Sequence, residues 1–281
     1  MKEKPSSPRD DSAHLIRHSK AEYFTYRAIK GSEHPERGFD PEDQITPDLS
    51  QAGREFAEEK AREFFARFDP RTDVFFFASS NEARALETAD IYRRIAHELG
   101  FEVIKHKRTG TDLAKKIGEG EIRTIESLSL NSPNILLNTL FNPKDQVGTI
   151  NWTNVDPETR RKWEQARVAI DAHDYGSFGA NFFHHSKTVQ AIFPEIKTAE
   201  DKFHTQFKNL LRLIEFAKRK VSSSGEAKNI RVVAFGHEDY LGHALNEYFQ
   251  DHEIRNCEVI DVPLGEEGIT LKRRGQVRRV K

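Results

Sequence analysis

Cysteine and long apolar runs are scarce in this sequence of 281 residues. Its single cysteine, Cys257, excludes an internal disulfide framework and a cysteine-rich zinc site. No apolar stretch approaches the roughly 18 residues that span a bilayer, and residues 1–8 contain no hydrophobic signal segment. Together these absences predict a soluble protein of a reducing compartment, which we expect to be cytoplasmic.

The chain also lacks an excess of charge of either sign. Its 44 lysines and arginines nearly balance its 45 aspartates and glutamates, which leaves a net charge of −1. This balance argues against general binding to nucleic acid or acidic membranes, so we expect neither as a partner. The exception is the basic run 272–281, which we interpret as a solvated terminal tail. The pattern does not indicate an oligomeric state.

Apolar residues are arranged as strands alternating with helices. Twenty phenylalanines supply ample core material. Apolar runs of strand length occur at 13–16, 74–78, 101–104, 230–235 and 259–262. Helical periodicity occurs at 50–68, 82–99, 157–170, 203–217 and 241–248. This alternation predicts an α/β three-layer sandwich, in which helices flank a mostly parallel central sheet.

The periodicity also predicts a domain organisation. Residues 1–12 are polar and are expected to form a disordered tail. Residues 13–109 and 203–281 would form the α/β core, and 110–202 a mainly helical insertion or cap. The segment 20–48 reads as a long surface loop, and loops of that length are usually functional.

Three strand ends carry side chains that suit an anion site. Arg17 and His18 directly follow the first strand, Arg84 lies in the first turn of the helix after the second strand, and His237 follows the fourth. The carboxyl ends of parallel strands converge on one crevice. Two arginines and two histidines there predict a cationic pocket for phosphate, because the guanidinium fork matches phosphate oxygens.

His18 is also a candidate nucleophile. Neutral histidine can form a covalent intermediate with phosphorus. The neighbouring cation of Arg17 should lower the pKa of His18, because a like charge disfavours the imidazolium form. Such a histidine would stay unprotonated and ready to attack.

Four short blocks resemble the motifs of one family. Residues 15–22 look like the opening Arg-His-Gly signature of the histidine phosphatase (phosphoglycerate mutase-like) superfamily. Residues 49–53 resemble its Leu-Thr-x-x-Gly element, and 79–89 its Ser-Ser-x-x-x-Arg-Ala-x-x-Thr-Ala block. Gly236 and His237 match its final histidine. The blocks occur in the family's order, while about 110–225 carries no matching motif.

The resemblance implies a role for each of these residues. His18 would accept the phosphoryl group, Arg17 and Arg84 would bind phosphate, and His237 would stabilise the transition state. It also implies that no metal or organic cofactor is needed. The histidines at 173, 184 and 185 suggest no metal site either, because adjacent histidines point apart on regular elements.

The sequence departs from the family pattern at Ser19, where the family has glycine, and at the proton donor. A leaving alkoxide needs a general acid. The glutamate of the mutase-like branch is missing from 105–112, where Asp112 is a possible substitute. In the acid-phosphatase branch the donor closely follows the second histidine, which favours Glu238. Asp239, Asp112 and Glu126 remain alternatives, and Glu238 could instead cap the following helix.

These observations predict a phosphate monoester hydrolase that works through a phosphohistidine at His18. The substrate would be a phosphorylated small molecule or a phosphoprotein. Two alternatives are a phosphoglycerate mutase-like phosphotransferase and a non-catalytic phospho-ligand binder. The absence of the mutase-type glutamate favours hydrolysis, whereas Ser19 and the uncertain donor motivate the binder.

Overall fold

The fold is known from a computed structural model, which describes most of the α/β core and parts of the rest. The described residues are 10–21, 49–80, 82–106, 118–125, 156–172, 178–194, 198–222, 228–238, 241, 245–251, 253–265 and 268–280.

Three parallel strands form the centre of the sheet: β1 (Ser12–Arg17), β2 (Asp73–Ser79) and β5 (Asn229–Gly236). β5 lies between the other two and pairs with both along their lengths, in parallel. Nearly every residue of these strands is buried. Burial on both faces explains why they read as continuous apolar runs rather than as alternating ones.

Five further strands extend the sheet on both sides. β3 (Glu102–Val103) and β4 (Ile122–Thr124) pair with β2 in parallel. On the other side, antiparallel pairing continues from β1 through β6 (Val259–Gly265), β7 (Gly268–Arg273) and β8 (Gln276–Arg279). The sheet order is β3-β2-β5-β1-β6-β7-β8, with β4 beside β2. The predicted sheet with a mostly parallel core is therefore confirmed.

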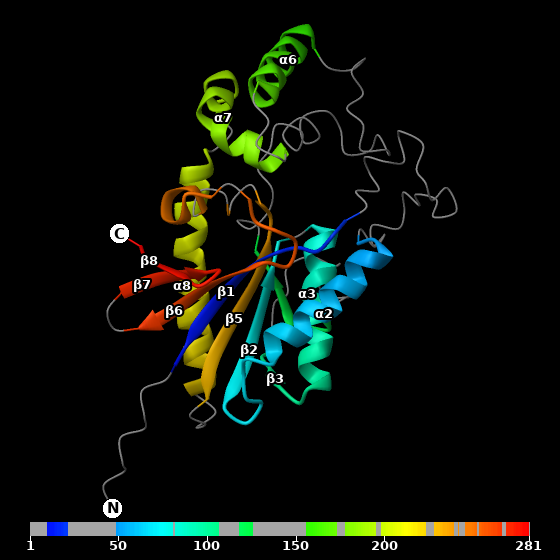
Figure 1. Ribbon diagram of the computed structural model, residues 1–281, viewed down its shortest axis with the longest axis vertical. Coiled ribbons are helices and arrows are strands. Elements are labelled where there is room, and N and C mark those ends of the chain that lie inside the picture. Colours follow the sequence, from blue (N-terminus) through cyan, green and yellow to red (C-terminus); the bar gives the residue numbers. More distant parts are fainter. Residues whose placement is uncertain are drawn as a thin grey trace, which may run out of the picture.

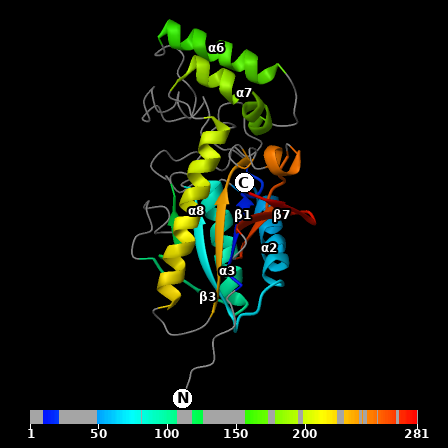
Figure 2. The ribbon, with the colours of Figure 1, turned by 90° about the vertical axis from the view of Figure 1, so that its left-hand side faces the viewer.

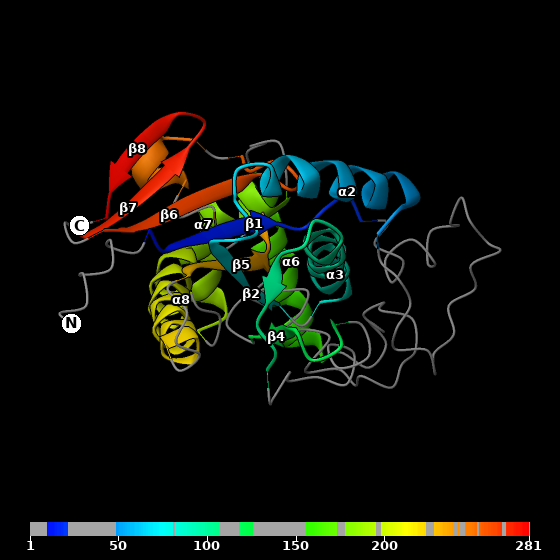
Figure 3. The same ribbon diagram turned by 90° about the horizontal axis from the view of Figure 1, so that it is seen from below.

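Helices cover the sheet on both faces (Figures 1 and 3). Phe75 and Phe77 of β2 pack in one hydrophobic core with α2 (Gln51–Phe65) and α3 (Ala83–Glu98). Phe76, between them, points into the opposite core beneath α8 (Ala199–Ser222). Successive strand residues face opposite sides of a sheet, so β2 supplies both cores. This arrangement confirms the predicted three-layer sandwich.

The start of α2 is fixed by its cap and lies against the chain that leaves β1. The Ser50 hydroxyl accepts a hydrogen bond from the Gly53 amide at 2.9 Å, as expected of an N-cap serine. A Cβ atom at Gly53 would lie 2.1 Å from the carbonyl oxygen of Lys20. Glycine is therefore required here by close approach of two backbones.

Two more helices lie beyond the carboxyl ends of the parallel strands. These are α6 (Pro157–Asp171) and α7 (Phe178–Ile192), which pack against each other (Figures 1 and 2). Asp156 caps α6 by accepting from the Thr159 amide at 3.0 Å, with proline in the first turn. No helix among the described residues is both long and apolar enough to cross a membrane.

The structure shifts two predicted boundaries. Strand β4, at Ile122–Thr124, belongs to the central sheet although it falls inside the range 110–202 assigned to the insertion. The predicted tail 1–12 overlaps β1, which begins at Ser12, because the Asp11 carboxylate accepts a hydrogen bond from the Ile230 amide. Residues 1–9 and the predicted loop from 22 to 48 lie outside the described residues.

Two elements near the C-terminus also differ from expectation. The run 272–281 was expected to be a solvated tail, but it contains the end of β7 and all of β8. Within this run Arg273 is buried in ion pairs with Asp251 and Glu258, and Leu271, directly before the run, is buried as well. Within the predicted helix 241–248, the described residues form a π-helix, η3 (Leu245–Phe249).

Replacing Phe77 with alanine should lower the free energy of unfolding by about 3–5 kcal/mol. The Phe77 ring is fully buried and stacks with Phe75 and Phe235. Leu99→Ala is the control, because Leu99 is 39% exposed and should cost much less. Urea unfolding followed by circular dichroism measures both variants. An equal effect of the two would contradict this account of the core.

Candidate functional site

The parallel pairing of β1 with β5 brings His18 and His237 together. Arg17 and Gly236 are register partners, and the His18 amide donates to the Gly236 carbonyl at 3.0 Å. The two imidazole rings are 5.1 Å apart at their centroids, inclined at 59°. Both side chains are buried. The structure thus places these two strand ends side by side, although 219 residues separate the histidines in the sequence.

One hydrogen bond defines the tautomer of His18. Its Nδ1 lies 2.6 Å from the Ser19 carbonyl oxygen, which can only accept. Nδ1 therefore carries the proton, and the lone pair of a neutral ring is on Nε2. Burial lowers the pKa of His18 well below its ordinary value, and the positive charges of Arg84 and Arg17 lower it further. The ring is neutral at physiological pH.

The backbone around His18 is held by three neighbours. Thr88 Oγ1 accepts from the Ser19 amide at 3.0 Å, and the Ser19 hydroxyl donates to the Gly53 carbonyl at 2.6 Å. Asn256 Nδ2 donates to the His18 carbonyl at 2.9 Å. Ser19, at the position where the resembling motif has glycine, is therefore buried. Its hydroxyl connects the turn after β1 to the start of α2 by a hydrogen bond.

Arg17 and Arg84 supply the positive charge beside these rings. Arg17 Nη2 lies 3.2 Å from Glu238 Oε2, and Nη1 donates to the Ile254 carbonyl. Its Nε is buried and has no hydrogen-bond partner within the described part of the chain. Arg84, in the first turn of α3, is buried with Nη1 3.6 Å from Glu82 Oε2. A buried donor without a partner is costly, so Arg17 is suited to an anionic ligand.

Ser80 is a site residue that the sequence analysis missed in this role. The N-cap of α3 is Glu82, which makes no capping hydrogen bond with its side chain. The Ser80 hydroxyl accepts weakly from the Glu82 amide at 3.3 Å and contacts His237 Nε2 at 2.8 Å. This one oxygen therefore links the second histidine to the helix that carries Arg84. The pair Ser79-Ser80, at the start of the block that contains Arg84, was the feature of the sequence that could have indicated this role.

Among the candidate proton donors, only Glu238 can be located. Its carboxylate is buried beside Arg17, one residue after His237. Asp239, Asp112 and Glu126 lie outside the described residues. The structure therefore brings together Arg17, His18, Arg84, His237 and Glu238. Two neutral-capable imidazoles, two guanidiniums and one carboxylate can bind a tetrahedral oxyanion and exchange protons with it.

Comparison with solved structures identifies the architecture. A phosphoglycerate mutase from Bacillus anthracis has a TM-score of 0.50 and 11% identity, with 95% of each chain covered. A phosphoserine phosphatase mutant from Entamoeba histolytica, in complex with phosphoserine, has a TM-score of 0.41 and 14% identity, covering 95% of this chain and 97% of that one. No family model matches the sequence, and no curated protein does.

At these identities the likeness establishes the fold. The chain has the phosphoglycerate mutase-like α/β fold, which the resemblance to the histidine phosphatase superfamily implied.

The pKa of His18 should rise in an Arg84→Gln variant, because one of the two positive charges is removed. It should remain below the ordinary value of 6.5, since burial is the larger cause. An NMR pH titration, with the His18 signal assigned by its loss in His18→Ala, measures both values. The exposed Arg62 provides the control variant Arg62→Gln, which should leave this pKa unchanged. A fall in the pKa on removing Arg84 would contradict the proposed electrostatics.

Proposed function

We propose that the protein is a phosphate monoester hydrolase in which His18 is the nucleophile. The observation that carries this proposal is the state of His18: a buried neutral imidazole whose Nδ1 proton is bound to the Ser19 carbonyl, so that the Nε2 lone pair is available. The positive charges of Arg17 and Arg84 act on this ring and lower its pKa, which supports a role for both guanidiniums in binding the phosphate that it attacks. The fold neighbours include a mutase and a phosphatase.

In the first step, His18 Nε2 attacks phosphorus and the bond from phosphorus to the leaving oxygen breaks. A proton from Glu238 moves to that oxygen, so that an alcohol rather than an alkoxide departs. The guanidiniums of Arg17 and Arg84 stabilise the charge on the three equatorial oxygens, and His237 donates to one of them. The products of this step are a phosphohistidine and a Glu238 carboxylate.

In the second step, a water molecule attacks the phosphohistidine. The Glu238 carboxylate takes a proton from this water while the bond between phosphorus and Nε2 breaks. Inorganic phosphate leaves, and His18 returns to its neutral form with the proton still on Nδ1. Glu238 is again protonated, so the cycle is complete with one water consumed.

The Arg17–Glu238 ion pair connects substrate binding to proton transfer. A phosphate dianion that binds Arg17 competes with Glu238 for the same guanidinium. Loss of the cation from the carboxylate makes its protonated form more favourable. Glu238 is therefore able to act as an acid once phosphate is bound, although it pairs with Arg17 beforehand.

A non-catalytic phospho-ligand binder is the second candidate. The same ion pair favours it, because a Glu238 that stays paired with Arg17 has no proton to donate. Such a protein would bind phosphate with Arg17 and Arg84 but would not turn over. A mutase-like phosphotransferase would form the same phosphohistidine and return the phosphoryl group to an organic acceptor instead of water.

Incubation with p-nitrophenyl phosphate across acidic and neutral pH should release nitrophenolate and inorganic phosphate. His18→Ala should reduce this to background, because the variant lacks the proposed nucleophile. Rapid acid-free quenching with labelled substrate should show an acid-labile, alkali-stable phosphoryl group on the wild type only. Turnover by the wild type no greater than by His18→Ala would leave the binder as the function. Transfer to glycerol in preference to water would indicate a phosphotransferase.

Glu238→Gln should slow hydrolysis of an alkyl phosphate about a hundredfold or more, because its alkoxide needs a proton. With p-nitrophenyl phosphate, the rate of phosphohistidine formation should fall far less, because nitrophenolate leaves without a proton. Burst kinetics separate formation of the phosphohistidine from its breakdown. Asp239→Asn is the matched control. If that variant, and not Glu238→Gln, shows the dependence on leaving group, Asp239 is the donor.

A further inference from the structure

The edge of the sheet at β8 is an exposed strand. β8 pairs with β7 only, and no other described strand lies along its second edge. All four of its residues are exposed, including Val277 at 52%. An exposed strand edge presents unpaired backbone groups that can pair with another chain. The candidate site lies at the ends of β1, β2 and β5, and β6 and β7 separate β8 from β1, the nearest of these strands (Figure 3).

The hairpin geometry shows which backbone groups face outward. Arg274 and Gly275 both have positive φ, at 46° and 77°, and form a two-residue turn of type I′. The pair that closes such a turn, Arg273 with Gln276, is hydrogen-bonded, and hydrogen-bonded pairs alternate along an antiparallel ladder. The amide and carbonyl groups of Val277 therefore point away from β7. The bond from the Val280 amide to the Ile269 carbonyl, at 2.9 Å, fits this alternation.

The charge on this edge is positive and differs from the charge at the turn. Arg273 and Arg274, next to the turn, are neutralised by Asp251 and Glu258. Arg278 instead donates to the Val277 carbonyl and to Gln276 Oε1, both at 3.0 Å. It forms no ion pair with a carboxylate within the described part of the chain. Because the whole protein has a net charge of −1, this positive charge is a local feature.

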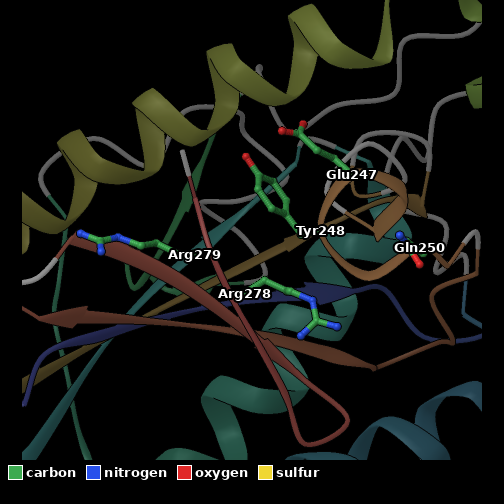
Figure 4. A pocket seen from close by; sticks show the side chains of 5 residues that line it. All are labelled: Glu247, Tyr248, Gln250, Arg278 and Arg279. Carbon is green, nitrogen blue, oxygen red and sulfur yellow. The ribbon is translucent and has the colours of Figure 1, made fainter.

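A pocket of about 330 Å³ adjoins the strand (Figure 4). Arg278 and Arg279 line it from β8, and Glu247, Tyr248 and Gln250 line it from η3 and the residue after it. The Tyr248 hydroxyl interacts with Glu247, and burial together with this carboxylate raises the pKa of Tyr248 to about 12. The phenol therefore stays protonated and keeps its interaction with Glu247.

We propose that β8 is a docking edge for an acidic extended peptide, which adds to the sheet as a further strand. The backbone of the peptide would pair with the outward amide of Val277, whose carbonyl already accepts from Arg278, and a carboxylate of the peptide would bind Arg278. Side chains at alternate positions would reach the pocket beside η3, in the manner of other strand-addition sites. A second copy of this chain fits less well, because pairing β8 with itself would place arginines near arginines.

Binding of a fluorescein-labelled acetyl-(Glu-Val)4-amide peptide, followed by anisotropy, tests this proposal. Val277→Pro should weaken binding about tenfold, because it removes an outward amide without removing a bond to β7. Val277→Thr, which keeps the amide, should bind like the wild type. Arg278→Glu should weaken binding several-fold, and added salt should reduce the difference. The peptide (Lys-Val)4 should not bind.

The test is independent of the proposed enzymatic activity. Val277 lies outside the candidate active site, so phosphatase turnover should be unchanged in both Val277 variants and thermal melting should confirm that they fold. Equal binding of the acidic peptide by wild type and Val277→Pro would overturn the proposal, as would its failure to bind at all. A concentration-dependent dimer that is lost in Val277→Pro would assign the edge to a second copy. Single-stranded RNA binding that survives Val277→Pro would assign the arginines to nucleic acid.

Discussion

The hydrogen bond from His18 Nδ1 to the Ser19 carbonyl is the contact on which the candidate site depends. It fixes the proton on one side of the ring and leaves Nε2 free. Burial and two arginines keep the ring from taking a second proton. The hydrogen bonds of Ser19 with Thr88 and Gly53 position the Ser19 carbonyl, and this carbonyl in turn orients the His18 ring. The close approach of Gly53 to Lys20 belongs to the same arrangement.

Much of the fold and the meeting of the two histidines could be predicted from the sequence. Strands buried on both faces leave continuous apolar runs, and these runs located β1, β2 and β5. Once three parallel strands are placed, their carboxyl ends must lie at one edge of the sheet. The proximity of His18, Arg84 and His237 follows from topology, without any information on individual contacts.

The elements that escaped prediction depend on contacts between distant residues. The three residues of β4 have no pattern of their own and become a strand by pairing with β2. In the C-terminal hairpin, the buried Leu271 stands between Thr270 and Lys272, and burial of Arg273 requires Asp251 and Glu258 from earlier in the chain. The role of Ser80 likewise depends on His237, which lies 157 residues away.

In the proposed function, Arg17 would exchange one of its partners for the substrate phosphate, and this exchange would change the charge balance of the site. Before binding, Glu238 and the Ile254 carbonyl occupy the two terminal nitrogens of its guanidinium, and Nε is left without a partner. A tetrahedral dianion offers oxygens to Nε and to the terminal nitrogen that faces Glu238 at the same time, in the bidentate geometry that arginine favours. Displacement of one carboxylate by another anion leaves Arg17 paired while it frees Glu238 for a proton. A lysine at position 17 also has several donors, but it lacks the planar fork that presents two parallel N–H groups to one anion while a third nitrogen keeps its bond to the Ile254 carbonyl.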